Sequence, residues 1–117
     1  MTGSEVVDSR FLASMAGREA FLRRMFAVFI AQEPKRIEQI RQALEQGDAE
    51  GLRHLAHALK GGAATMGVGG VRDCCQRLEQ ASRDQDLAAA RRHVDDLESE
   101  MRLAYSFMFH YLAEHQA

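Results

Sequence analysis

Apolar residues recur at helical spacing along most of the chain. Phe, Leu, Met and Ile side chains form a broad face between residues 18 and 33, and the spacing continues with Ile37, Ile40 and Leu44. Later segments repeat the same interval of three or four residues. No stretch alternates apolar and polar residues in the way a half-buried strand does. The pattern predicts an all-α protein.

Capping and helix-breaking residues set the expected bounds of the first helices. Asp8 or Ser9 can begin a short helix that ends near Gly17. A first long helix is expected to end before Pro34, because proline fits the first turn of a helix better than its interior. The second long helix then runs from Pro34 to Gly47.

Two aspartates mark the later helices. Asp48 is the expected cap of a helix over residues 49–66, and Asp86 caps a last helix of about 28 residues, or about 42 Å. A glycine-rich turn makes helices 49–66 and 69–83 antiparallel. We therefore expect an antiparallel four-helix bundle with a short N-terminal covering helix and a long C-terminal helix. The short helix is expected to cover the distal segment Tyr105–Leu112, which is apolar almost all round.

The composition limits the class of protein. With 117 residues, 46% of them apolar, the chain is long enough for one domain with its own core. We expect residues 1–8 to be disordered and residues 9–117 to form that domain. A net charge of −2 gives no basic footprint for nucleic acid. Without a long apolar run or a signal-peptide pattern, we expect no membrane contact and a cytoplasmic location.

One histidine stands apart from the apolar stripe of the helix that carries it. His57 lies about 140° around the helical wheel from the centre of that stripe, so it is expected to face solvent. The stripe itself must face a core. Its members are Leu52, Leu55, Ala56, Leu59, Ala63 and Met66.

The surroundings of His57 are unusually bare for an exposed helix face. Ala58, Gly61, Gly62 and Ala64 replace the long polar side chains that normally stand there. Each glycine costs about 1 kcal/mol of helix stability against alanine, so the missing side chains indicate that another surface comes close. Lys60 lies one turn from His57 and could place an ammonium beside an anion on the imidazole. These features predict a phosphoryl carrier.

The segment 56–61, AHALKG, resembles the AHxLKG signature of histidine-containing phosphotransfer (HPt) domains of two-component phosphorelays. The similarity extends through Ala63, Ala64, Gly67 and residues 75–79, and the helical layout from about residue 18 to residue 112 is also similar. The resemblance implies that residues 9–117 form an HPt-like bundle.

The resemblance also implies the partners. They are receiver domains of response regulators or of a hybrid sensor histidine kinase, which supply the aspartate and the Mg²⁺, while His57 relays phosphoryl groups between aspartates. The chain itself needs no cofactor or metal, and no nucleotide site can be assembled from its residues. Ala58 and Gly62 stand where many family members carry a hydroxyl residue, which puts a hydroxyl contact to the phosphoryl group in doubt.

Each site residue has an expected role. Lys60 stabilises the phosphoryl group, and Gly61 leaves clearance for the partner. Counting equal helical rises from the turn near residue 68 places Glu79 at the height of His57 and Gln76 at that of Lys60. Glu79 or Gln76 can then accept a hydrogen bond from Nδ1 of His57, which leaves Nε2 as the atom to be phosphorylated. Further docking contacts are expected from Arg53, His54, Ala58, Ala64, Arg72 and Cys75.

Several alternatives remain open. His54 is a rival acceptor, and Cys74 and Cys75 with the two histidines could bind zinc, although the spacing is unusual for such a site. The competing function is a non-phosphorylated helical adaptor or dimerisation module that binds receiver or kinase domains. A homodimer could form through the C-terminal helix. The remaining histidines, expected to be solvated or interfacial, are His93, His110 and His115.

Overall fold

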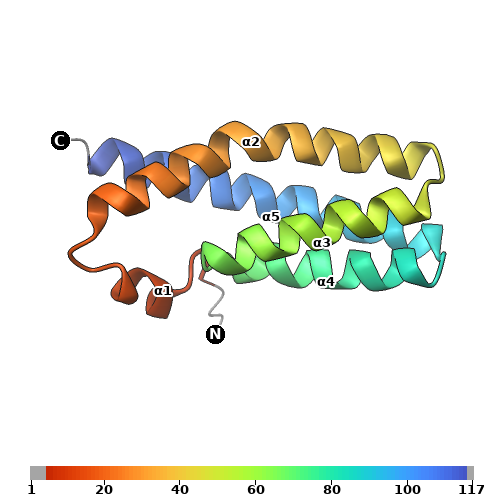
Figure 1. Cartoon of the computed structure of the whole chain (residues 1–117), viewed down its shortest axis with the longest axis horizontal. Coiled ribbons are helices and arrows are strands. Elements are labelled where there is room, and N and C mark those ends of the chain that lie inside the picture. The colour runs from red at the N-terminus through yellow and green to blue at the C-terminus, as the bar shows by residue number, and fades with distance from the viewer. Residues whose placement is uncertain (1–4, 116–117) are drawn as a thin grey trace.

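The computed structural model describes residues 5–115, which form α-helices joined by short turns and contain no strand (Figure 1). The helices are α1 (Ser9–Ser14), α2 (Glu19–Glu45), α3 (Ala49–Thr65), α4 (Gly69–Arg83) and α5 (Leu87–Glu114). The all-α prediction is confirmed.

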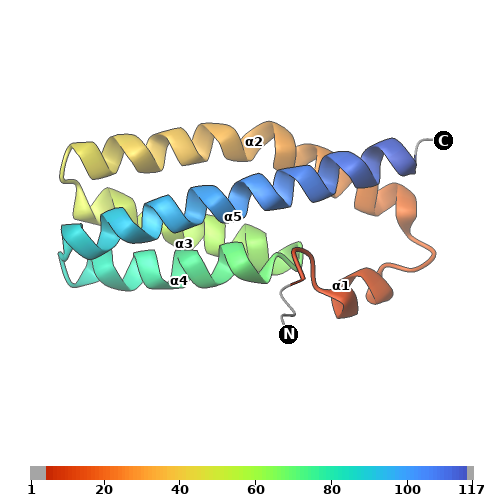
Figure 2. The ribbon, with the colours of Figure 1, turned by 180° about the vertical axis from the view of Figure 1, so that it is seen from behind.

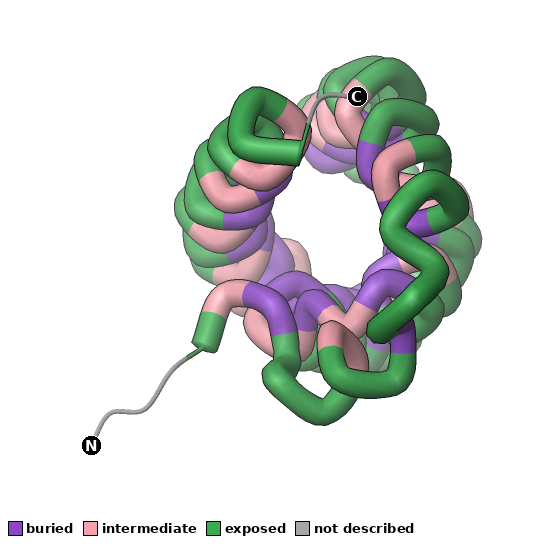
Figure 3. Tube along the Cα trace, turned by 90° about the vertical axis from the view of Figure 1, so that its left-hand side faces the viewer, coloured by how far each residue is buried: buried purple, intermediate pink, exposed green. Residues whose placement is uncertain are grey.

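Helices α2 to α5 form an antiparallel four-helix bundle. Contacts run from α2 to α3, from α3 to α4, from α4 to α5 and from α5 back to α2, so each helix has two neighbours. The bundle measures 45 × 30 × 18 Å, and α2 and α5 extend beyond the α3–α4 hairpin at one end (Figure 2). The buried parts of the helices face the bundle axis, and their exposed parts face outward (Figure 3).

Helix α2 runs without a break through Pro34, so the prediction of two separate helices was wrong. Proline removes one hydrogen bond from the helix, but Pro34 lies on the exposed side, where water can replace the bond. No glycine or capping residue precedes it to stop the first segment. The apolar face also continues across it, with Phe29 and Ile40 both buried. Continuous packing therefore decides against a break.

The short helix α1 lies at the turn between α3 and α4. The Asp8 side chain accepts a hydrogen bond from the Arg10 N–H and so caps the helix. The Asp8 N–H donates to the Gly67 carbonyl at 2.8 Å, and Val7 is buried. The chain thus joins the bundle before residue 9, the predicted start of the domain, while residues 1–4 lie outside the described part.

The distal part of α5 packs its aromatic rings against α2. Phe26 meets Phe107 and Tyr111 edge to face, with ring centroids 6.3 and 5.3 Å apart, and Phe29 meets Tyr105 at 6.2 Å. The expectation that the short helix covers this segment is corrected, because Asp8, the N-cap of α1, is hydrogen-bonded to the α3–α4 turn. The long helix α2 provides the apolar partner that the segment needs.

The predicted caps of α3 and α5 and the predicted stripe of α3 are confirmed. Asp48 accepts a hydrogen bond from the Gly51 N–H at 2.9 Å, and Asp86 accepts one from the Ala89 N–H at 3.1 Å. In the stripe of α3, only Leu55 is partly exposed. Helix α3 is thereby fixed in rotation, and this fixes which residues it turns outward.

Candidate functional site

His57 stands on the outward face of α3. Its side chain is 67% exposed, whereas Ala56 and Leu59 beside it are fully buried. Because the buried stripe holds the helix in rotation, the imidazole is presented to solvent by the fold itself.

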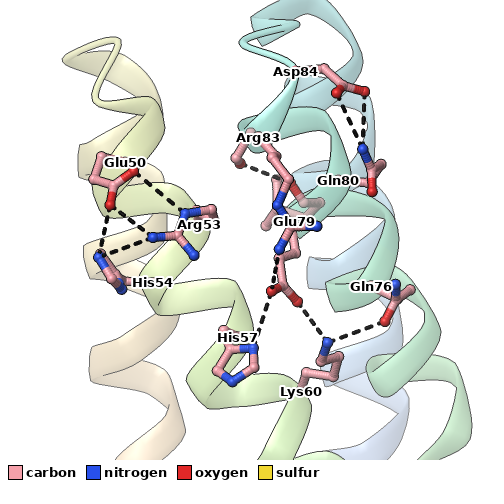
Figure 4. A network of polar contacts seen from close by, with 12 residues as sticks. Glu50, Arg53, His54, His57, Lys60, Gln76, Glu79, Gln80, Arg83 and Asp84 are labelled. Carbon is pink, nitrogen blue, oxygen red and sulfur yellow. Dashed lines mark hydrogen bonds and ion pairs between the residues drawn. The ribbon is translucent and has the colours of Figure 1, made fainter.

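A buried carboxylate from α4 orients the imidazole (Figure 4). Nδ1 of His57 lies 3.1 Å from Oε2 of Glu79, and the Glu79 side chain is only 6% exposed. An ionised carboxylate can only accept hydrogen bonds, so the proton of a neutral imidazole lies on Nδ1. Nε2 then keeps its lone pair and points away from Glu79 (Figure 4).

Glu79 is kept ionised by its neighbours. The Lys60 ammonium lies 2.7 Å from Oε1, an ion pair without the direction of a hydrogen bond, and Arg83 donates to Oε2 at 3.3 Å. Lys60 is the main cause that lowers the pKa of Glu79; burial opposes it, and His57 lowers it further. Sequence reasoning found neither the burial of Glu79 nor the contact of Arg83, although Arg83 stands four residues after Glu79 on the same helix face.

Gln76 contacts Lys60, not the imidazole. Its Oε1 accepts a hydrogen bond from the Lys60 ammonium at 3.2 Å. The helical count placed it correctly at the height of Lys60, but a direct role in orienting the ring was the wrong alternative, because Glu79 occupies Nδ1. Gln76 acts on the site only through Lys60.

The glycines after His57 are not required by internal packing. A Cβ atom added to Gly61 or Gly62 would meet no other atom within 4 Å. Ala58 and Ala64 on the same face are exposed. The bare surface that the sequence predicted beside His57 is therefore present.

The other expected docking residues differ in their accessibility. Arg53 and His54 both pair with Glu50, at 2.8 and 3.0 Å, and remain on the surface. Exposed Arg72 pairs with Asp73. Cys75 is fully buried, and burial raises the pKa of its thiol to about 12. The docking role predicted for Cys75 is therefore wrong: its side chain points into the core and cannot reach a partner.

A groove of about 540 Å³ between α2 and α3 lies directly beside the bare patch. Gly61 and Gly62 form part of one wall, and the other wall carries Phe21 and Val28, which are 39% and 51% exposed. Sequence reasoning missed this groove. The apolar face of residues 18–33 is broader than its two neighbouring helices need, and that breadth was the available signal. Its other lining residues are Arg24, Met25, Phe29, Gln32, Glu33, Thr65 and Met66.

The remaining polar candidates do not form a second centre in the described chain. Between residues 5 and 115, no cluster of three or more His, Cys, Asp or Glu side chains could hold a metal ion. His110 and His115 each place Nδ1 within hydrogen-bond distance of a carbonyl in the preceding turn, and His93 is partly buried. Within the same residues, no helix is sufficiently long and apolar to span a bilayer.

Comparison with known proteins identifies the family of this helical bundle. Residues 24–106 match the family model described as Hpt domain. The chain belongs to the Hpt domain family. The matched range contains α3, α4 and most of α2 and α5, and with them His57, Lys60 and Glu79.

Two proteins similar to this chain are described as phosphorelay or phosphotransfer proteins. The phosphorelay intermediate protein YPD1 of Candida albicans is 31% identical over 73 residues, and the match covers 62% of this chain and 40% of that protein. The chain thus spans less than half the length of this relative. The crystal structure of histidine-containing phosphotransfer protein B (HptB) from Pseudomonas aeruginosa PAO1 superimposes with a TM-score of 0.90 at 27% identity, covering 97% of this chain and all of that one.

A plant protein shares the fold at lower similarity. The X-ray structure of a rice protein described as a histidine-containing phosphotransfer protein has a TM-score of 0.79 at 20% identity. It covers 96% of this chain, and 85% of the rice chain is matched.

Proposed function

We propose that the chain is a phosphorelay carrier that accepts a phosphoryl group on Nε2 of His57 from an aspartate of one receiver domain and passes it to an aspartate of another. One observation carries the proposal: an exposed imidazole whose Nδ1 proton is held by the buried carboxylate of Glu79. The descriptions of YPD1 as a phosphorelay intermediate and of HptB as a phosphotransfer protein support it.

The transfer step follows from this geometry. The lone pair of Nε2 attacks phosphorus, an N–P bond forms, the P–O bond to the receiver aspartate breaks, and the electron pair leaves on the aspartate carboxylate. The nucleophile requires no deprotonation, because the proton of the neutral ring is on Nδ1. The reverse step donates the group to the next aspartate. The imidazolium character of the phosphorylated ring strengthens its hydrogen bond to Glu79.

Lys60 has the capacity for the predicted phosphoryl contact. An ammonium carries three N–H donors. Gln76 accepts one of them at 3.2 Å, and Glu79 is held as an ion pair at 2.7 Å. We propose that a remaining donor binds a phosphoryl oxygen on Nε2, so that Lys60 both holds Glu79 and neutralises transferred charge.

The proposed partners are receiver domains of response regulators or of a hybrid sensor kinase. Their docking surface would cover His57, the bare patch at Gly61 and the apolar groove. A small apolar centre with charged residues around it suits a contact that must dissociate after each transfer. The receiver would supply Mg²⁺ for the transfer, and no cofactor is proposed for this chain. A cytoplasmic location is supported by the two cysteines, which form no disulfide.

Incubation with receiver domains charged by acetyl phosphate tests the carrier function. Wild type should gain acid-labile phosphate, detected as a retarded band on a Phos-tag gel. His57→Gln should gain none, while His54→Gln should behave as wild type. Equal labelling of wild type and His57→Gln would assign the acceptor to another residue.

The adaptor alternative predicts a different outcome of the same experiment, namely receiver binding without label on the wild-type chain. A homodimer through the C-terminal helix remains a prediction. It would use the apolar side chains that α5 leaves half exposed, Leu103 and Phe109.

A further inference from the structure

The apolar groove between α2 and α3 has an acid in its wall. Glu33 lines the groove, yet it is only 5% exposed. Counting equal rises in both directions from the turn at Gly47 places Glu33 at the height of Gly61, and both residues line the same groove. The acid is therefore about one helical turn from the level of His57.

Glu33 is incompletely paired. One guanidinium nitrogen of Arg36 lies 3.4 Å from both carboxylate oxygens and donates only to Oε2, at the long end of hydrogen-bond distance. Oε1 is buried and accepts no hydrogen bond. Burial raises the pKa of Glu33, and the opposing effect of Arg36 is smaller. The Tyr105 hydroxyl, also buried, has no hydrogen-bond partner.

Packing alone does not explain an acid at this position. A half-satisfied buried carboxylate costs stability, and an apolar side chain of similar size would fill the same space without that cost. A rotation of the Glu33 side chain that turns its carboxylate toward the groove would let a bound group remove the deficit. Neutralising it requires a cation or another strong hydrogen-bond donor.

We propose that the groove takes a basic side chain of the docking partner, a lysine or arginine whose stem lies along the apolar walls and whose charged end pairs with the Glu33 carboxylate when that side chain turns toward the groove. The identity of the partner as a receiver domain rests on the proposed function. The groove's preference for a cation on an apolar stem does not depend on that function. Glu33 is then a residue that determines which partners dock.

The chemistry of the groove fits this occupant. Lysine and arginine carry apolar stems, and Met25, Phe29 and Met66 supply apolar and aromatic walls. Arg24 lines the groove nine residues before Glu33, about 13 Å along the helix axis. Arg36 contacts Glu33 but does not line the groove. The glycines at positions 61 and 62 leave the path between the groove and the His57 face open.

A pair of small probes tests the groove without any receiver. The positively charged 2-phenylethylammonium and the neutral 2-phenylethanol have similar shapes, and their binding can be followed by NMR titration. On wild type the ammonium should bind about tenfold more tightly, the gain expected from one charge-assisted hydrogen bond in a desolvated site. In Glu33→Gln the two probes should bind equally, with the affinity for the alcohol unchanged. Glu38→Gln, which removes an exposed acid of the same helix, should keep the tenfold preference.

Equal binding of the two probes to wild type, or a preference that persists in Glu33→Gln, would overturn the proposal. A second arm uses receiver domains that exchange phosphate with the chain. Glu33→Gln should weaken their binding at least threefold, and substituting the matching lysine or arginine of the receiver should add no further loss. If no receiver exchanges phosphate, the proposed function fails, while the probes still judge the groove.

Discussion

Helix α3 carries two histidines one turn apart that are equally exposed but differently supported. The side chains of His57 and His54 are 67% and 66% exposed. Each has a carboxylate partner at about 3 Å, Glu79 for His57 and Glu50 for His54. Exposure and the presence of a partner acid therefore do not distinguish the two residues.

The difference lies in what holds the acid. The Glu79 side chain is 6% exposed and is held by Lys60 and Arg83, whereas the Glu50 side chain is 70% exposed and lies on the same helix as His54. An exposed pair of this kind is free to exchange with water and orients its histidine weakly. A buried acid with its own cations fixes both the ring and its tautomer. The supporting acid from the neighbouring helix, rather than the histidine itself, therefore distinguishes the site at His57 from the pair at His54.

Of the substitutions that test this difference, Glu79→Ala is expected to have the largest effect on stability and on phosphoryl transfer. The substitution leaves the partly buried Lys60 without its carboxylate, which should lower the free energy of unfolding by about 1–3 kcal/mol. Loss of the orienting bond should also slow phosphoryl transfer at least about tenfold. Urea denaturation and single-turnover transfer measure the two effects. The matched change Glu50→Ala should leave both unchanged; an equal effect of both substitutions would remove the distinction.

The two histidines also differ in the residue one helical turn later in the chain. Gly61 stands four residues after His57, whereas Ala58 stands four residues after His54. Gly61→Arg should slow transfer at least about tenfold, equivalent to about 1.4 kcal/mol of docking free energy, because its side chain would project from the bare patch. The variant should remain folded, since the Cβ position is open.

Gly61→Ala is the control for this change. It should stabilise the helix by up to about 1 kcal/mol and leave transfer near the wild-type rate. Slow transfer by Gly61→Ala would mean that the glycine is needed for the shape of α3 rather than for clearance. Transfer by Gly61→Arg at the wild-type rate would place the docking surface elsewhere.

Those parts of the structure that depend on local sequence could be predicted. The stripe from Leu52 to Met66, the caps at Asp48 and Asp86 and the bounds of α4 follow from helical spacing and side-chain hydrogen bonding within a few residues. The height of Glu79 relative to His57 also followed, because a tight turn between two helices fixes their register. Each of these inferences uses one helix or one hairpin.

Features that depend on packing between distant segments could not be predicted in the same way. Pro34 carries a strong local signal for a helix start, but packing of α2 along the whole bundle overrides it. Helical spacing gave no sign that Glu79 is buried, whereas contacts with the neighbouring helices bury its side chain and also that of Cys75, which was expected at the docking surface. The α2–α3 groove depends on how far the two helices separate near Gly61. The spacing of apolar residues along one helix does not predict that separation.

The smallest expected effect is a difference between Glu79 and Glu50 in how their contribution to stability depends on pH. The pKa of Glu79 is lowered in the fold, so its ionic contacts contribute stability above the ordinary value of 4.5 and lose it as the pH falls through the lowered pKa. The stability difference between wild type and Glu79→Gln should thus be constant near neutral pH and shrink below about pH 4.5. The pKa of Glu50 is also lowered, chiefly by Arg53, but this contact is exposed. Urea denaturation in 0.5 M salt, a concentration that screens surface charges, tests this contrast. The stability difference between wild type and Glu79→Gln should still vary with pH under these conditions, whereas the difference between wild type and Glu50→Gln should not. The same salt sensitivity for both variants would show that Glu79 is as accessible to ions as Glu50, and the buried support of His57 would then lose its physical basis.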